Sequence, residues 1–462
     1  MSMQGSGSGS LRRPGTATGG LRPADAASGT GGLGFSTIKT RPFLPTEPKS
    51  VEDTGLRLDL IADLALKIMY FRGFMTGQEI AEAMRLPFVN VVDKALDFLK
   101  REKYCEVRGS TGLGEMAYQY SITIKGGERA REILDRNQYT GPAPVPLPVY
   151  NDAIHKQTIN NVYVSEEDMR QSLSHLVLNE DILARVGPAA NSGRSIFLYG
   201  PPGNGKTVIA EAIAKMLKGD VFIPYAVEVD GHIIRVFDVV NHKPLTDPDA
   251  TASTKPGEYD KRWVLCERPI VVVGGELTLA SLDLVYDDNA KFYEAPFQMK
   301  SNGGMFIIDD FGRQQARPRD LLNRWIVPLE KRVDFLTLRT GKKIEIPFDQ
   351  LIVFSTNIPP RELVDEAFMR RIRHKIEICN PTYDEYREIF RRICQNRGVR
   401  YEDEGVIYLL KEYYVQAKRP LRACHPRDIV DQLVDTARFM KVRPALSKEL
   451  LDRAAHAYFV EL

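Results

Sequence analysis

The stretch Gly200–Thr207 constrains this chain more than any other. It reads Gly-Pro-Pro-Gly-Asn-Gly-Lys-Thr and fits the G-x-x-x-x-G-K-[ST] template of a phosphate-binding loop. The short apolar run 195–199 before it predicts a buried parallel strand, and the amphipathic run 208–217 after it predicts a helix. Backbone N–H groups of such a loop converge on phosphate oxygens at a helix N-terminus. The sequence therefore predicts an α/β nucleotide-binding fold.

Residue types within this loop have separate chemical tasks. Lys206 is expected to reach the β- and γ-phosphates, and the hydroxyl of Thr207 is expected to hold Mg²⁺. The residues expected to bind the nucleotide are Gly200, Pro201, Pro202, Gly203, Asn204, Gly205, Lys206, Thr207 and Val208.

Composition limits the class of protein. At about 150 residues per domain, the 462 residues predict roughly three units. Lys and Arg total 63 against 61 Asp and Glu, and this net charge of +2 is not that of an obligate nucleic-acid binder. Five scattered cysteines without C-x-x-C spacing argue against zinc and a disulfide framework. Without an apolar run of roughly 18 residues, the chain is expected to be soluble and cytoplasmic, with no membrane span.

Residues 1–52 and 53–137 differ sharply in pattern. Residues 1–52 are rich in Gly, Ser, Thr, Ala and Pro, so we predict a disordered low-complexity tail. Residues 53–137 predict three helices (56–71, 76–84 and 88–100), a hairpin (104–108 with 118–123) and a last helix at 125–136. That order resembles a winged helix, an α+β domain.

The winged-helix-like domain leaves two functions open. Its third helix would enter the major groove in a DNA reader. However, that helix carries Asp93 and Asp97, and carboxylates facing phosphates repel them. A protein-docking role is therefore favoured over DNA binding, although Arg108, Lys125, Arg129 and Arg131 keep DNA possible.

Four prolines between 139 and 150 predict a semi-rigid linker over 138–154. A nucleotide-binding α/β subdomain is expected over 155–380. It begins with a helix capped by Ser165, and Asp230-Gly231 predicts a hairpin turn. The 103 residues from Lys206 to Asp309 exceed what such a core needs, so an insertion is expected at about 219–302.

Polar side chains follow two further predicted strands. Asp309 and Asp310 end the apolar run 305–308, and Asn357 ends the run 351–356. The carboxyl ends of parallel strands face the ligand crevice of open α/β sheets. Mg²⁺ needs a carboxylate partner there, and a polar side chain at such a strand end can orient a water near the γ-phosphate. The remaining segment, 381–462, has helical periodicity throughout and predicts a helical lid.

The order of these motifs resembles the AAA+ ATPases over about residues 155–462. The stretches 364–371 and 425–428 are most similar to bacterial MoxR-like proteins described as ATPases with chaperone activity. The resemblance implies ATP and Mg²⁺ as cofactors, Asp309 as the metal carboxylate of the Walker B motif and Asp310 as the water-activating acid. It also implies that Asn357 is sensor 1 and Arg427 sensor 2.

The resemblance further implies a homo-oligomeric ring, commonly a hexamer, in which an arginine of one subunit completes the neighbour's site. Such a finger contributes about 10³- to 10⁵-fold in rate. Arg370 or Arg371 is the first candidate and Arg373 the second. Phe292 and Tyr293 are either pore residues that grip a substrate or, more commonly for aromatics, core residues.

Three functions remain open from the sequence. The favoured one is an ATP-hydrolysing ring that remodels a protein or protein complex, with a protein substrate or adaptor as partner. The second is a nucleic-acid-linked ATPase that uses the winged-helix-like domain on DNA. The third is an ATP-gated scaffold with little hydrolysis, because most AAA+ proteins carry Glu where this chain has the shorter Asp310.

Overall fold

The computed structural model describes residues 43–245, 259–363 and 369–459. The predicted tail 1–52 therefore lies largely outside the described residues. Its last ten residues are described and are packed against the protein, contrary to the prediction. The ring of Phe43 contacts those of Phe222 and Trp263, and the carbonyl of Pro45 accepts a hydrogen bond from the backbone N–H of Asp260.

Residues 52–136 form helices around a small antiparallel sheet. Thr76 caps the second helix through a reciprocal bond pair with Glu79, as the sequence predicts. The third helix begins later than predicted, because Val89 and Asn90 have non-helical backbone angles. The sheet has the order β1-β3-β2. The elements are η1 (Glu52–Thr54), α1 (Leu58–Arg72), β1 (Met75–Thr76), α2 (Gly77–Met84), η2 (Phe88–Val92), α3 (Asp93–Arg101), β2 (Cys105–Ser110), η3 (Glu115–Ala117), β3 (Tyr118–Ile122) and α4 (Ile124–Arg136).

A five-stranded sheet forms the centre of the nucleotide-binding part, and its order is β10-β13-β16-β5-β17. All neighbouring pairs are parallel, which confirms the predicted α/β core. The strands are β5 (Ser195–Tyr199), β10 (Ile270–Val273), β13 (Met305–Ile308), β16 (Leu351–Thr356) and β17 (His374–Glu377). Strand β10 belongs to this sheet, so the predicted insertion 219–302 includes a strand of the core. The predicted boundaries of the insertion therefore enclose too many residues.

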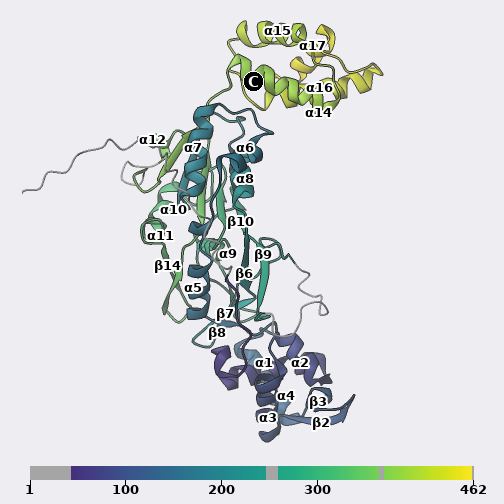
Figure 1. Cartoon of the computed structure of the whole chain (residues 1–462), viewed down its shortest axis with the longest axis vertical. Helices are drawn as coiled ribbons and strands as arrows, with labels where there is room; N and C mark the ends of the chain where they lie inside the picture. Colours follow the sequence, from purple (N-terminus) through teal and green to yellow (C-terminus); the bar gives the residue numbers. More distant parts are fainter. Residues whose placement is uncertain (1–42, 246–258, 364–368, 460–462) are drawn as a thin grey trace, which may run out of the picture. The chain divides into compact units, whose positions relative to one another are not determined.

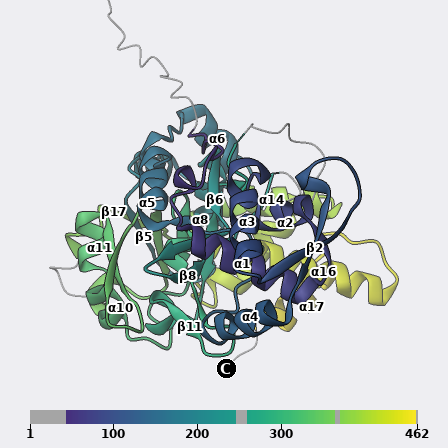
Figure 2. The ribbon, with the colours of Figure 1, turned by 90° about the horizontal axis from the view of Figure 1, so that it is seen from below.

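Helices cover both faces of this sheet. Alternate strand residues such as Ile196 and Ile307 pack with one set of helices, α6 (Glu166–Leu173), α7 (Glu180–Asn191) and α8 (Lys206–Met216). Their neighbours Phe197 and Ile308 pack on the opposite face with α10 (Pro318–Arg324) and with Trp325, which precedes α11 (Ile326–Lys331). Helices α10 and α11 lie next to each other in both views (Figures 1 and 2). Two buried faces explain why these strands read as continuous apolar runs.

The segment between α8 and β13 adds smaller sheets. The Asp230-Gly231 turn joins β7 and β8, with both residues at positive φ, as the sequence predicts for a tight hairpin. The elements are β6 (Asp220–Pro224), β7 (Ala226–Val229), β8 (His232–Arg235), β9 (Trp263–Glu267), η5 (Ala280–Leu282), β11 (Val285–Asp287), β12 (Phe292–Glu294) and α9 (Phe297–Lys300). Residues 246–258 of the predicted insertion lie outside the described residues.

The aromatic pair on β12 lies in the core. Tyr293 is 2% exposed, and its hydroxyl accepts a hydrogen bond from the backbone of Arg339. The ring of Phe292 packs edge-on against that of Tyr139. Of the two roles left open by the sequence, the structure supports the core role, in which these aromatics stabilise the inserted sheet.

The proline-rich stretch 138–154 is also part of the packed fold, so the predicted linker is wrong. Strand β4 (Val145–Pro146) pairs in parallel with β7, and α5 (Leu147–Lys156) follows directly. The hydroxyl of the buried Tyr150 donates to the carbonyl of Met299. The local composition is that of a linker. The segments that this stretch packs against are distant in sequence, so the composition alone does not reveal them.

Residues 382–458 form the predicted helical lid. Its helices are α14 (Tyr383–Arg397), α15 (Asp403–Leu409), η6 (Leu410–Val415), α16 (His425–Met440) and α17 (Lys448–Tyr458). They enclose their own core, and Tyr386, Tyr414 and His425 form a buried hydrogen-bonded chain within it. The remaining elements are η4 (Ile159–Asn161), the hairpin of β14 (Val333–Thr337) and β15 (Lys343–Pro347), and α12 (Pro360–Leu363).

Candidate functional site

The phosphate-binding loop connects β5 to α8 as predicted. Gly203 and Gly205 have φ values of 80° and 82°, a region that favours glycine. Helix α8 begins at Lys206, so the loop and its first N–H groups lie at a helix N-terminus. This placement favours an anion, because the unpaired N–H groups and the helix dipole both attract negative charge.

Sheet order explains how the polar side chains meet. Strand β16 lies between β13 and β5, so Asn357 emerges between Asp309 and the loop that carries Lys206. The ammonium of Lys206 donates to Oδ1 of Asn357 at 2.6 Å, and Nδ2 of Asn357 donates to Oδ1 of Asp310 at 3.1 Å. One asparagine thus links the loop lysine to the second carboxylate.

The other hydrogen bonds of the Lys206 ammonium are made to backbone carbonyls, which a phosphate could replace. Its ammonium also donates to the carbonyls of Gly200 and Pro201, at 3.0 and 2.9 Å. Burial lowers the pKa of Lys206, and the nearby carboxylates of Asp309 and Asp310 partly oppose that shift. An ammonium held at a cavity by neutral carbonyls can exchange them for anionic oxygens, which form stronger charge-assisted bonds.

Thr207 and Asp309 lie side by side next to the phosphate-binding loop. The hydroxyl of Thr207 donates to Oδ2 of Asp309 at 2.8 Å. A hydroxyl and a carboxylate side by side, facing a phosphate-binding loop, are the oxygen ligands that Mg²⁺ takes. The residues present therefore fit Mg²⁺ with a nucleotide phosphate, as predicted from the sequence.

A cavity of about 470 Å³ contains these groups and extends to the lid. Its polar end is lined by the loop residues 202–208 with Asp309, Asp310, Ser355 and Asn357. Gly200 and Pro201 do not line it and act instead as the acceptors of Lys206. The rest of its lining includes the apolar side chains of residues 176–178 and of Ile389 and Ile393 on α14, together with the polar His175, Arg392 and Asn396.

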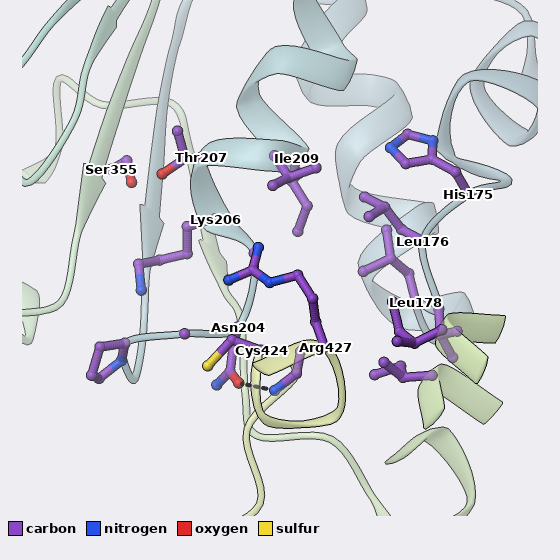
Figure 3. A pocket seen from close by; sticks show the side chains of 18 of the residues that line it. His175, Leu176, Leu178, Asn204, Lys206, Thr207, Ile209, Ser355, Cys424 and Arg427 are labelled. Atoms are coloured by element: carbon purple, nitrogen blue, oxygen red, sulfur yellow. Dashed lines mark hydrogen bonds between the residues drawn. The ribbon is translucent and has the colours of Figure 1, made fainter. Parts of the chain in front are cut away.

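The lid contributes Arg427 to this cavity. Pro426 occupies the first turn of α16, and the guanidinium of Arg427 donates to Asp428 at 2.9 Å. Figure 3 shows the side chain of Arg427 between Lys206 on one side and Leu176 and Leu178 on the other. Its position fits the predicted role of sensing a phosphate from the lid.

The three candidate finger arginines are not brought into this cavity. Arg370, Arg371 and Arg373 are absent from its lining. The guanidinium of Arg371 donates to Glu330 of α11 at 2.6 Å. Residues 364–368, part of the stretch that precedes these arginines, lie outside the described residues.

Sequence reasoning missed the bonds that fasten the loop to the lid. The side chain of Asn204 is 5% exposed; it accepts from the N–H of Ala423 and donates to Asn380. The N–H of Cys424 donates to the carbonyl of Gly203 at 2.8 Å. Asn204 stands at a variable position of the loop template, so the motif gave no signal for this role. The apolar run 176–178, which lines the cavity, is a local signal that sequence reasoning did not use.

Comparisons with known proteins agree with this site. Residues 196–244 match the family model described as "ATPase family associated with various cellular activities (AAA)". Residues 382–457, the lid, match a domain of unknown function, DUF8689. Together with the loop, the two carboxylates and the asparagine, the first match supports the AAA+ superfamily.

Two curated relatives are similar over part of the chain. One, from Rothia mucilaginosa, is described as an AAA ATPase forming ring-shaped complexes; it is 28% identical over 156 residues, 34% of this chain and 24% of the relative. The other is replication factor C subunit 2 of Arabidopsis thaliana, 29% identical over 119 residues, 25% of this chain and 35% of the relative. The matches thus span about a quarter to a third of the relatives' length.

Solved structures give only distant similarity. The RuvB Holliday junction branch migration motor of Thermotoga maritima is 15% identical, with 67% of this chain and 74% of that chain covered and a TM-score of 0.34. NtrX of Brucella abortus in complex with ADP is 13% identical, with 61% and 56% covered and a TM-score of 0.38. Both TM-scores lie below the range that would show a shared fold.

Proposed function

We propose that this chain, whose nucleotide-binding core is that of the AAA+ ATPase superfamily, hydrolyses ATP in a homo-oligomeric ring and remodels a protein or protein complex. The observation that supports hydrolysis is the chain of contacts from Lys206 through Asn357 to Asp310, beside the Thr207–Asp309 pair. It gathers a phosphate-binding cation, a water-orienting amide, an acid and a metal site at one sheet edge.

Each residue has a defined part in this proposal. Lys206 pairs with phosphate oxygens in place of the carbonyls of Gly200 and Pro201. Thr207 and Asp309 hold Mg²⁺, which when bound would neutralise charge on the β- and γ-phosphates. Asp310 accepts a proton from the attacking water, and Asn357 holds that carboxylate and the water in position.

The positions of the candidate finger arginines support assembly into a ring. The cavity of one chain contains Arg427 from its own lid but none of Arg370, Arg371 and Arg373. An arginine supplied by a neighbouring copy would complete the charge stabilisation, which makes hydrolysis conditional on assembly. The relative from Rothia mucilaginosa is described as forming ring-shaped complexes, which favours the same arrangement here. A hexamer is the stoichiometry we propose.

The N-terminal region is proposed to recruit the substrate. We propose that its helices and strands form a winged-helix-like domain, attached to an ATPase core that is most like those of MoxR-like chaperone ATPases. On α3, Asp97 and Lys100 form an ion pair at 2.8 Å, and Asp93 starts the helix. This mixture of charges favours a protein partner over a DNA backbone, which attracts unopposed basic residues.

No helix in the described ranges 43–245, 259–363 and 369–459 is long and apolar enough to cross a membrane. We propose a cytoplasmic location, because the scattered cysteines form no disulfide framework within the described residues and suit a reducing compartment.

A nucleic-acid-linked ATPase is the second candidate function, favoured by the similarity to replication factor C subunit 2. A DNA-binding isotherm at several salt concentrations separates the two, because a DNA reader loses affinity steeply as salt rises.

Steady-state phosphate release by purified protein at high concentration tests the proposal. Wild-type protein is expected to turn over ATP, Lys206→Ala to lose ATP binding, and Asp310→Asn to bind ATP and assemble without turnover. Partners captured on the assembled Asp310→Asn protein would identify the substrate. Absence of turnover in wild-type protein that binds ATP and assembles would exclude the motor and favour the ATP-gated scaffold.

A further inference from the structure

We propose that Arg392 is a positioning residue for the base of the nucleotide, because it fastens lid helix α14 to the segment Ser174–Leu178. This inference deepens the proposed function and depends on its nucleotide site. It assigns to the lid a second contribution to ligand binding, in addition to Arg427.

The contacts of Arg392 are specific. Nη1 donates to the carbonyl of Ser174 at 2.7 Å and to that of Leu176 at 3.2 Å. Nε donates to the carboxylate of Glu388, one helical turn earlier, at 2.8 Å. The carboxylate orients the guanidinium fork, so its donors are aimed at the two carbonyls before any ligand binds.

The segment that Arg392 holds forms one wall of the cavity. Residues 175–178 line the cavity, and so do Ile389, Ile393, Asn396 and Arg392 itself on α14. Figure 3 shows Leu176 and Leu178 on the side of the cavity away from Lys206 and Thr207. A nucleotide whose phosphates lie at Lys206 would place its apolar ring system at this end.

Arg392 therefore sets the spacing between two walls that a flat aromatic base would fill. The segment 174–179 lies between α6 and α7 without regular structure of its own. Removing the guanidinium frees two carbonyls and lets this wall separate from α14. Because charge-assisted hydrogen bonds that order the binding wall are lost, we expect about tenfold weaker binding, which corresponds to about 1.4 kcal/mol.

Arg391 provides a matched control on the same helix. Its guanidinium also donates to Glu388, with Nε at 2.8 Å, but forms no hydrogen bond to the segment 174–176 among the described residues. Arg391→Ala removes the same charge and a bond to the same carboxylate. Only Arg392→Ala releases the segment.

Equilibrium binding of two probes tests the inference. One is a fluorescent ATP analogue labelled on the ribose, and the other is inorganic triphosphate, which has no base. For Arg392→Ala we expect about tenfold weaker binding of the ATP analogue and binding of triphosphate within twofold of wild type. Arg391→Ala is expected to bind both probes within twofold. Arg392→Lys, which keeps the charge but loses the fork, is expected to bind the ATP analogue with intermediate affinity.

Two results would overturn the inference: equal binding of the ATP analogue by the Arg392→Ala and Arg391→Ala proteins, or an equal loss of both probes in Arg392→Ala. The second result would indicate a general structural role. Neither result depends on hydrolysis, so the inference can fail while wild-type turnover persists. If wild-type protein binds neither probe, the proposed function itself fails.

Discussion

Nζ of Lys206 lies 2.6 Å from Oδ1 of Asn357, and the other side-chain atom of that amide, Nδ2, donates to Asp310. The asparagine therefore contacts both the residue that binds phosphate and the acid proposed to activate water. A phosphate that draws Lys206 away would leave Oδ1 of Asn357 available to a water molecule, next to Asp310. Arrival of the nucleotide and preparation of the attacking water would be coupled through one side chain.

Asn357→Ala is expected to lower kcat for ATP about 100-fold while changing nucleotide affinity only a few-fold, because removing one preorganised polar group costs about 2.7 kcal/mol of transition-state stabilisation. Phosphate release and fluorescent-nucleotide binding measure the two effects. Asn289→Ala, an exposed change in the turn between β11 and β12, is the control and should retain wild-type values. Normal turnover in Asn357→Ala would exclude a role in the chemical step.

Mixing of two inactive variants is expected to restore activity if an arginine is shared between copies. Lys206→Ala protein is expected to be inactive. One of the three variants Arg370→Ala, Arg371→Ala and Arg373→Ala, the one that removes the finger, is also expected to be inactive. When the finger variant is mixed with an equal amount of Lys206→Ala protein, about a quarter of the interfaces pair an intact binding site with an intact finger. The mixture should therefore recover about a quarter of wild-type turnover. Arg443→Ala, at an exposed arginine of the lid, should stay active alone. Full activity in all three finger variants would refute an arginine finger in this cluster.

Gly200 and Gly205 are expected to respond differently to alanine, although both have positive φ. A Cβ on Gly200 would lie 2.3 Å from the backbone carbonyl oxygen of Ile378, whereas a Cβ on Gly205 would meet nothing within 4 Å. We expect Gly205→Ala to cost about 1–2 kcal/mol from backbone strain alone. Gly200→Ala should cost clearly more, since backbone must move. Urea unfolding without nucleotide measures both free energies, and equal losses would contradict this geometry.

His425 is expected to make the stability of the lid depend on pH. Burial lowers its pKa to about 4, whereas an unfolded histidine titrates near 6.5. The neutral form stabilises the fold fully above pH 6.5. Below that pH the unfolded chain takes up a proton that the folded imidazole does not, so stability falls as the pH drops toward 4.

Urea unfolding at pH 7.5 and pH 5 measures this effect. Wild-type protein should lose about 1–2 kcal/mol more than His425→Gln between these pH values, because the unfolded histidine takes up a proton that the folded imidazole resists. His155→Gln, at an exposed position of α5, should behave as wild type. An identical pH dependence in wild type and His425→Gln would show that the imidazole does not carry it.

The sequence predicted the parts whose signal is local. Apolar runs located β5, β13 and β16, and the motif residues after them meet because parallel strands end at one edge. Helical periodicity over 381–462 predicted the helical segment that contains α14 and α16. Contacts between distant segments were not predictable in this way. The partner of Val145 is Val227, and no pattern near either residue indicates the other.

Proline content misled the prediction of a linker for a physical reason. Proline fits an extended linker, a strand edge and the first turn of a helix equally well. Here Pro146 ends β4 and caps α5, and Pro148 lies within the first turn. The buried Tyr150 keeps this stretch packed against the rest of the protein. Burial depends on the whole fold, so the local sequence does not indicate it.

The parallel pairing of β4 with β7 limits how this protein can be divided. A fragment that starts at residue 155, where the nucleotide-binding subdomain was expected to begin, lacks β4, most of α5 and the hydroxyl of Tyr150. Strand β7 would then present unpaired N–H and C=O groups at a sheet edge, which is a template for aggregation. A fragment intended for study of the ATPase alone should begin no later than residue 143, so that it retains this strand.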